Sequence, residues 1–115
     1  MKKKSRHAAL RRKHEFRYYN SIVINRRGQK VKFRHPAYIF LVKGNNFLFV
    51  TITHSSSVKE HVVLKLRRNP NPKDKRDAYY VAEVIDDTKD QFRKRLSDWK
   101  IDPLDDLDIQ NLYKK

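Results

Sequence analysis

The chain has 115 residues, which is enough for one small domain and too few for two independent cores. It carries 28 Lys and Arg against 13 Asp and Glu, a net charge of +15, and 11% aromatic residues, a composition that favours a highly charged but folded protein. The absence of cysteine excludes disulfides, zinc fingers and thiol catalysis. The sequence has neither an apolar run of membrane-helix length nor a secretory signal, so we expect a cytoplasmic protein without a membrane partner.

The positive charge is concentrated towards the N-terminus. Residues 1–35 hold 13 Lys and Arg against a single acid, a net charge of +12, whereas residues 36–115 hold 15 against 12, a net charge of +3. This asymmetry is typical of a surface that binds a polyanion such as nucleic acid. We therefore divide the chain into a basic N-terminal arm, residues 1–19, and a small domain, residues 20–115. A helix from about Ser5 to Arg17 that forms on binding is one expectation for the arm, and a solvated tail is the other.

Short β-strands are expected in the first part of the domain. Residues 21–24 and 30–33 flank a turn with Gly28, and residues 38–43 and 47–53 flank a turn with Gly44, so both pairs are typical of hairpins. The second hairpin is almost continuously apolar and is expected at the centre of the sheet. Further strands are predicted at 61–66 and 79–85, on either side of a proline-containing loop.

The last 30 residues change to a helical period. A helix is predicted over residues 88–100, with Phe92, Leu96 and Trp99 in one apolar stripe. A second helix is predicted to begin with Asp102 as its N-cap and Pro103 at its first position, with an apolar stripe of Leu104, Leu107 and Leu112. The predicted fold is mainly β with C-terminal helices, a small SH3-like or OB-like partly open barrel.

Groups suited to phosphodiester chemistry occur at one end of the central hairpin. One group precedes the strand expected at residues 38–43, and the other follows the strand expected at 47–53. In an antiparallel pair the start of one strand and the end of the other lie side by side, so the two groups should be neighbours. An arginine can hold a phosphate, and a histidine can act as general acid or base without a metal or cofactor. For each residue taken alone, a structural role is the alternative. The candidate catalytic residues are Arg34, His35, Thr53, His54 and Ser55.

The stretch from Arg34 to Ser55 resembles the toxin barrels of the PemK/MazF type. In that family an Arg-Pro-(Ala/Val) step opens an apolar strand and an Ile-Thr step closes a later one; here Pro36 and Ala37 match the first step and Thr53 matches the threonine. The resemblance implies a sequence-specific endoribonuclease with an acidic antitoxin as its partner. His35 stands where the family has arginine, so that arginine is either Arg34, out of register, or replaced by His35.

A second candidate surface is the loop Arg67–Arg76, which is stiffened by two prolines and followed by two tyrosines. Basic and aromatic residues in alternation suit contact with the backbone and bases of a single strand, and a solvated loop with a tyrosine in the core is the alternative. Together with the arm and the first turn, this gives ten candidate nucleic-acid-binding residues: Arg11, Arg12, Lys13, Arg26, Arg27, Arg67, Arg68, Lys73, Arg76 and Tyr79.

The sequence therefore predicts a small β-barrel protein that binds RNA or single-stranded nucleic acid. Two classes of function remain open. The first is a metal-independent endoribonuclease of toxin–antitoxin type. The alternative is a non-catalytic protein of a phage or mobile element that binds nucleic acid or blocks an enzyme.

Overall fold

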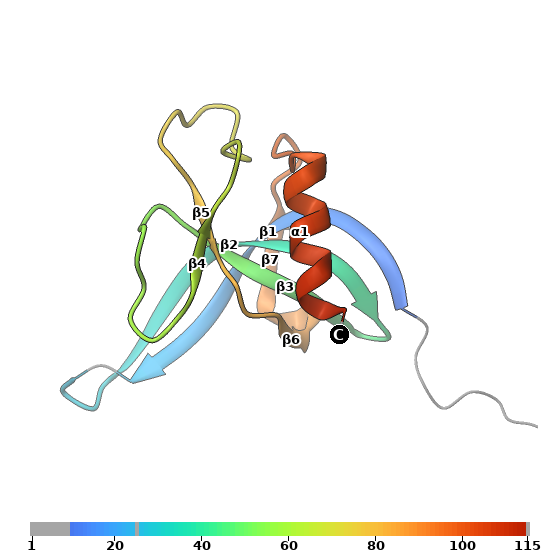
Figure 1. Cartoon of the computed structure of the whole chain (residues 1–115). Helices are drawn as coiled ribbons and strands as arrows, with labels where there is room; N and C mark the ends of the chain where they lie inside the picture. Colours follow the sequence, from blue (N-terminus) through green and yellow to red (C-terminus); the bar gives the residue numbers. More distant parts are fainter. Residues whose placement is uncertain (1–9, 25, 115) are drawn as a thin grey trace, which may run out of the picture.

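The computed structural model describes residues 10–24 and 26–114, which form a twisted antiparallel sheet with one C-terminal helix (Figure 1). The strands pair in the order β4-β5-β3-β2-β1-β7, with β6 also paired to β3, and the sheet is partly open. This confirms the predicted fold class, with one helix in place of two. The elements are β1 (Leu10–Ile24), β2 (Lys30–Lys43), β3 (Asn46–Thr53), β4 (Val63–Lys65), β5 (Tyr79–Val81), β6 (Ile85–Thr88), the 3-10 turn η1 (Lys89–Gln91), β7 (Phe92–Arg95) and α1 (Pro103–Tyr113).

Both predicted hairpins are confirmed. The β1–β2 hairpin ends at the pair Ile24 and Lys30, and the β2–β3 hairpin ends at Lys43 and Asn46. Gly28 and Gly44 have φ angles of 77° and 59°, which glycine adopts without the steric cost of a side chain. Strands β2 and β3 are central, as their continuous apolar sequences predicted.

The N-terminal helix prediction is wrong over its described part, because residues 10–19 belong to β1. This strand pairs with β2 along nearly its whole length, and it buries Glu15 and Phe16. The long-range partner supplies ladder hydrogen bonds and an apolar face, which override the weak helical pattern of the segment. Residues 1–9 of the predicted arm lie outside the described residues.

The helix predicted over residues 88–100 is also wrong. The chain there forms the end of β6, then η1 and β7. The three aromatic and apolar residues of the expected stripe separate: Phe92 packs on Phe47 and Phe49, whereas Leu96 and Trp99 pack against the opposite face of the sheet. Apolar residues three and four apart suit a helix, but an extended chain that is broken by a turn can place them on two faces.

Helix α1 begins where the sequence predicts. Pro103 occupies its first position, and the Asp102 carboxylate accepts hydrogen bonds from the backbone N–H of Leu104, at 2.8 Å, and of Asp105, at 3.3 Å. No helix in the described part of the chain has the length and apolar character to cross a membrane.

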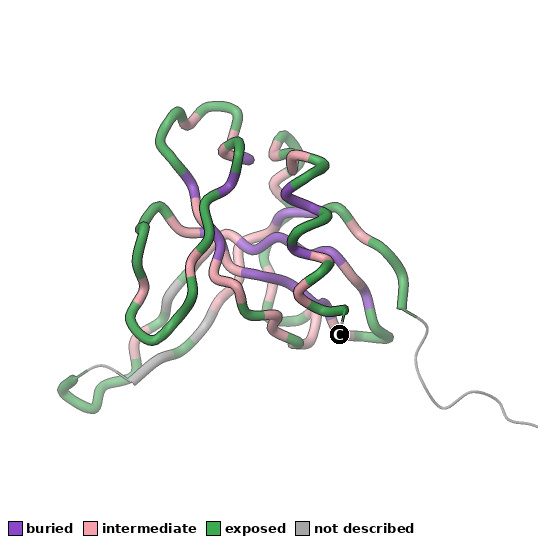
Figure 2. The backbone as a smooth tube through the Cα atoms, in the orientation of Figure 1, coloured by how far each residue is buried: buried purple, intermediate pink, exposed green. Residues whose placement is uncertain are grey.

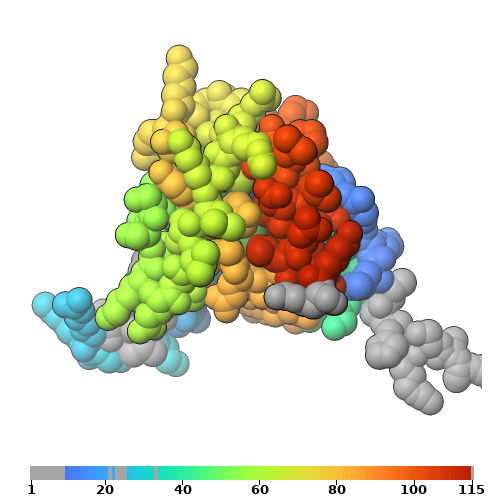
Figure 3. Space-filling model, viewed as in Figure 1, coloured from blue at the N-terminus to red at the C-terminus, as the bar shows by residue number. Residues whose placement is uncertain are grey.

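The orientation of α1 was predicted wrongly. Leu104 and Leu107 of the expected stripe are 56% and 51% exposed, whereas Asp105, Asp106 and Ile109 are buried. The Asp105 and Asp106 carboxylates accept hydrogen bonds from donors that would otherwise be unsatisfied. These bonds stabilise the orientation in which the acidic face of the helix packs on the sheet. Figure 3 shows α1 lying against the segment that follows β4.

Two sets of bonds hold α1 to the sheet. Asp105 accepts from the backbone N–H of Arg67, at 3.0 Å, and from its guanidinium, at 2.7 Å. Asp106 accepts from the hydroxyl of Tyr38 at 2.6 Å. Burial raises the pKa of the Asp105 carboxyl despite the opposing effect of Arg67, and burial together with the hydrogen bond to Asp106 raises that of Tyr38.

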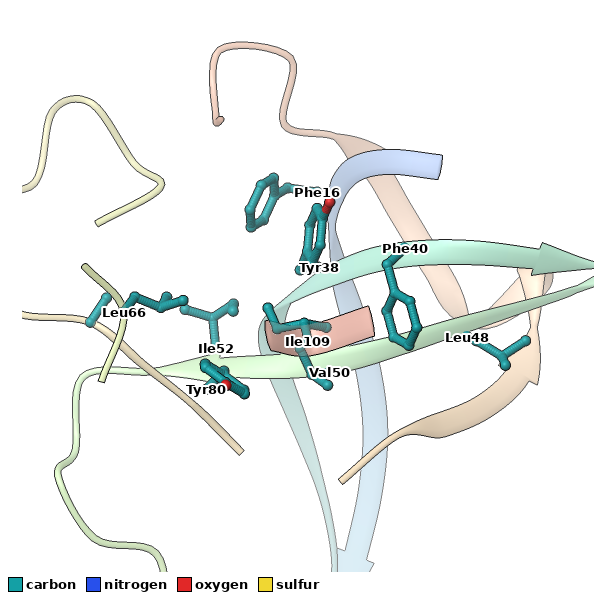
Figure 4. Packing of buried hydrophobic residues seen from close by; sticks show 10 residues of the cluster. Phe16, Tyr38, Phe40, Leu48, Val50, Ile52, Leu66, Tyr80 and Ile109 are labelled. Carbon is teal, nitrogen blue, oxygen red and sulfur yellow. The ribbon is translucent and has the colours of Figure 1, made fainter. Parts of the chain in front are cut away.

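The sheet carries an apolar cluster on each face. Figure 2 shows where the buried residues lie along the chain, and Figure 4 shows the cluster beneath α1. Buried residues concentrate on β2 and β3, whose alternating side chains contribute to both clusters. The cluster beneath α1 contains Phe16, Tyr38, Phe40, Leu48, Val50, Ile52, Leu66, Ala78, Tyr80 and Ile109. The cluster on the other face contains Ala37, Ile39, Val42, Phe47 and Phe49, with Tyr19, Ile85 and Phe92 against it.

Glu15 is expected to make folding stability depend on pH. Burial would raise the pKa of this carboxyl, but the hydrogen bond and charge of Arg17, with the charge of Lys13, outweigh it and hold the pKa below its ordinary value of 4.5. A depressed folded-state pKa contributes stability above 4.5 that is lost as the pH falls through 4.5 and below. Glu15→Gln should therefore lower the free energy of unfolding by about 1.5–3 kcal/mol at pH 7. In urea titrations the difference from wild type should shrink at acid pH, and a difference that does not change with pH would contradict this origin.

Candidate nucleic-acid interface

The sheet and the proline loop enclose a small cleft of about 180 Å³, here called the junction cleft. His35 and Pro36 of β2 reach it from one strand, and Thr53 and His54 reach it from the end of β3. Its other lining residues are Ile52, Asn69 and Trp99. The antiparallel pairing of β2 and β3 thus brings three of the predicted catalytic residues, His35, Thr53 and His54, to one cavity.

The other two predicted catalytic residues lie elsewhere. Ser55 is exposed in the turn after β3, where its backbone N–H donates to the Thr53 hydroxyl at 3.1 Å. Arg34 lines a separate groove. Arg34 and His35 are neighbours in an extended strand, so their side chains leave opposite faces of the sheet.

His54 connects the junction cleft to the loop Arg67–Arg76. Its Nδ1 lies 3.2 Å from the carbonyl oxygen of Asp77, and its Nε2 lies 3.1 Å from the Arg76 guanidinium and 3.3 Å from a carboxylate oxygen of Asp74. The same guanidinium donates to Asp74 at 2.8 Å and holds the pKa of that carboxyl far below its usual range. The loop thereby places an arginine and a carboxylate beside a histidine.

This arrangement can perform proton transfer next to a phosphate. An imidazole can take a proton as a general base, for which His54 Nε2 would exchange its contact with Arg76 for one with the substrate, and the guanidinium can hold a phosphate and stabilise the charge that develops on it. His35 also lines the junction cleft. Nothing in this chemistry requires a metal, and within the described residues no group of three or more His, Asp or Glu is arranged to hold one.

A second groove runs along the β1–β2 hairpin and has a volume of about 550 Å³. Its lining includes three cations, Lys32 and Arg34 from β2 and Arg93 from β7, together with Asn20, Ile22 and Gln91. The Arg34 guanidinium lies 6.0 Å from the centroid of the Tyr18 ring, within reach of a cation–π contact. We call this feature the basic groove.

Several of the predicted nucleic-acid-binding cations are instead paired within the protein. Arg12 pairs with Asp106, Lys13 with Glu15, Arg67 with Asp105 and Asp108, and Arg76 with Asp74. Arg11, Arg26, Arg68 and Lys73 are exposed and have no carboxylate within 4.0 Å among the described residues. Arg27 is exposed in the turn of the first hairpin, and Tyr79 is half-buried in β5.

Sequence reasoning missed part of both sites. Lys32 belongs to the basic groove, and its signal was the alternation of cations at 30, 32 and 34, which places three positive charges on one face of a strand. Arg93 was missed because its segment was assigned to a helix. His61 Nδ1 lies 3.1 Å from Glu83 Oε1, and no local sequence pattern predicts this contact because the two residues are 22 positions apart.

Comparisons of the chain with protein-family models, with curated proteins and with solved structures gave no match.

Proposed function

We propose that this protein binds nucleic acid through the far part of the β1–β2 hairpin, residues 20–34, here called the basic ribbon. The ribbon contains five cations and no acid. Several cations on the body of the domain pair with buried or half-buried carboxylates, such as Glu15, Asp74 and Asp105. Four cations of the ribbon, Arg26, Lys30, Lys32 and Arg34, have no carboxylate within 4.0 Å among the described residues and follow one another along a single hairpin, and this observation carries the proposal.

The position of the ribbon favours contact with an extended ligand. Beyond the pairs of Tyr19 with Phe92 and Ala37 with Thr51, the two strands pair only with each other in the described chain. Figure 1 shows their turn lying away from the rest of the sheet. The basic groove follows one face of the ribbon, and Tyr18 offers an aromatic ring beside Arg34. A backbone-tracking groove next to an aromatic ring suits single-stranded RNA or DNA.

The double variant Lys32→Ala/Arg34→Ala is expected to weaken binding to single-stranded RNA of any sequence. Each phosphate contact that is lost removes about 0.7 from the slope of log K against log salt, so the slope should fall by roughly 1.4. Fluorescence anisotropy titrations at several salt concentrations measure both quantities.

The matched control is Lys100→Ala/Lys114→Ala, which removes the same charge from two exposed positions outside the basic groove. It should bind almost as wild type does. If the two double variants have the same affinity and slope, binding depends on net charge and the ribbon is not the interface. A wild-type protein that binds neither RNA nor DNA would refute the proposed function.

A second candidate function is metal-independent RNA cleavage, favoured by the junction cleft. His35, Thr53 and His54 line that cleft, and Arg76 contacts His54. In such a reaction a base removes the proton of the ribose 2′-OH, that oxygen attacks the adjacent phosphorus, the 5′-oxygen leaves with a proton from an acid, and a 2′,3′-cyclic phosphate remains. The resemblance to PemK/MazF-type toxins points to the same activity and to an acidic protein partner.

Incubation of the purified protein with labelled RNA and with single-stranded DNA in EDTA separates the two classes of function. Cleavage of RNA alone, with a cyclic phosphate end, supports the ribonuclease. Tight binding with both polymers intact over hours supports a non-catalytic protein that holds or blocks nucleic acid.

A further inference from the structure

A cleft of about 460 Å³ lies beside the junction cleft, on the face of the sheet opposite α1. Its apolar walls come from Tyr19, Val58, Val81 and Ile85, and Thr51, His61 and Glu83 add polar groups. We call it the apolar cleft. An apolar cavity of this size with a few polar groups is typical of a site for a small organic ring system.

The apolar cleft adjoins the residues of the candidate cleavage site. His35, Ile52 and Thr53 line both clefts. A ligand that passes around the end of β3 at Thr53 would place one part among apolar side chains and the other near His54 and Arg76. A nucleotide has these two parts, because its base is a flat ring system and its phosphate is an anion.

The polar side of the apolar cleft carries groups that could distinguish one base from another. Glu83 lines the cavity, its Oε1 lies 3.1 Å from His61 Nδ1, and its side chain is 59% exposed, so the carboxylate is accessible to a ligand there. An ionised carboxylate only accepts hydrogen bonds, and it can accept two side by side. Guanine presents two adjacent N–H donors on its Watson–Crick edge, whereas adenine, cytosine and uracil each present one donor beside acceptors.

A short hydrogen-bonded turn forms the wall of the apolar cleft next to His61 and Glu83. Val58 and His61 form an isolated β-bridge, with the His61 N–H donating to the Val58 carbonyl at 3.1 Å. Glu60 within this turn has a φ of 65°, an uncommon conformation for a residue with a side chain. The turn thus sets both the apolar wall at Val58 and the position of His61 before any ligand binds.

We propose that the apolar cleft binds a guanine base of the RNA, on the 5′ side of the phosphate that lies in the junction cleft, with Glu83 accepting from the Watson–Crick edge. This inference rests on the proposed function and adds a base specificity to it. Recognition of one nucleotide also gives the protein a sequence preference that the basic ribbon, which contacts the backbone, does not supply.

The test uses the whole protein and the four nucleoside 3′-monophosphates as probes, with titrations followed by NMR of the backbone amides. The 3′-GMP should bind at least about tenfold more tightly than the other three, the discrimination expected of one bidentate pair. The largest shifts should occur at residues of the apolar cleft. Glu83→Gln should abolish the preference for 3′-GMP, whereas Asp98→Asn, the same change at an exposed site outside the cleft, should leave it intact.

A second variant, Val58→Trp, fills the cleft without changing charge. It should abolish binding of all four nucleotides while RNA still binds through the ribbon, and thermal melting checks that each variant folds. Equal affinity for the four nucleotides, or 3′-GMP binding that survives Val58→Trp, overturns the inference. If RNA binds through the ribbon and 3′-GMP does not bind, the inference fails and the proposed function stands. If 3′-GMP binds and RNA does not, the proposed function fails, and with it the assignment of the cleft to a base of RNA.

Discussion

Replacement of Phe16 by alanine is expected to lower the free energy of unfolding by about 3–5 kcal/mol. The Phe16 side chain is only 2% exposed, and its ring lies 4.8 Å from that of Tyr38 and 5.5 Å from that of Trp99, centroid to centroid. It joins β1 to β2 and to the segment before α1, so its removal leaves a cavity between three parts of the chain that cannot all move together. Urea unfolding followed by circular dichroism measures the change.

Leu104→Ala is the control for this prediction. Leu104 is 56% exposed on α1, and alanine is the better helix former, so its free energy of unfolding should stay within about 0.5 kcal/mol of wild type. If residues 10–19 were a basic arm outside the fold, Phe16→Ala would be almost neutral as well. Equal effects of the two substitutions would contradict the position of β1 in the sheet.

Elements that local chemistry determines could be predicted from the sequence. Gly28 and Gly44 each supply the positive φ that the turn of a hairpin needs, and the alternating or apolar residues around them leave little choice of structure. The start of α1 is equally local, because Asp102 caps the helix within its own first turn and Pro103 suits that position.

Elements that depend on distant partners could not be predicted. Residues 10–19 form a strand because β2 lies beside them, with Leu10 paired to Lys43. Their own sequence lacks the alternation of apolar and polar residues that would predict a strand. The orientation of α1 depends on Tyr38 and Arg67, which need the acceptors that Asp105 and Asp106 provide. The spacing of leucines within the helix does not reveal which face is buried, because the hydrogen-bond donors that determine it are 38 and 68 residues away in the sequence.

The sequence predicted which histidines and which threonine converge, but it predicted the wrong arginine. Two strand ends meet in any antiparallel hairpin, so His35, Thr53 and His54 converge. The segment at Arg34 was treated as a loop before a strand at residue 38, whereas β2 begins at Lys30. Because side chains alternate between the two faces of a strand, Arg34 and His35 lie on opposite faces of the sheet. The arginine beside the junction cleft is instead Arg76, from the loop Arg67–Arg76.

If the junction cleft cleaves RNA, Arg76→Ala should lower the cleavage rate by about 10²–10³-fold. The Arg76 guanidinium lies 3.1 Å from His54 Nε2 and is 70% exposed, so a phosphate can reach its remaining donors. The loss should appear mainly in the rate of the chemical step, because the cations of the basic ribbon hold the RNA without it. Single-turnover cleavage of a labelled RNA in EDTA, with binding measured separately, tests both parts.

The matched control is Arg68→Ala, which removes the same charge from an exposed position in the same loop. Its rate should stay within about threefold of wild type, since an unpaired surface cation contributes to attraction and not to charge stabilisation at the cleft. Arg76→Lys should recover only part of the activity, because an ammonium cannot contact His54, Asp74 and a phosphate in the geometry of a planar guanidinium. Equal losses in Arg76→Ala and Arg68→Ala would mean that the loop acts by charge alone. If the wild-type protein binds RNA tightly and leaves it intact, the contacts among His54, Arg76 and Asp74 stabilise the loop and do not serve catalysis.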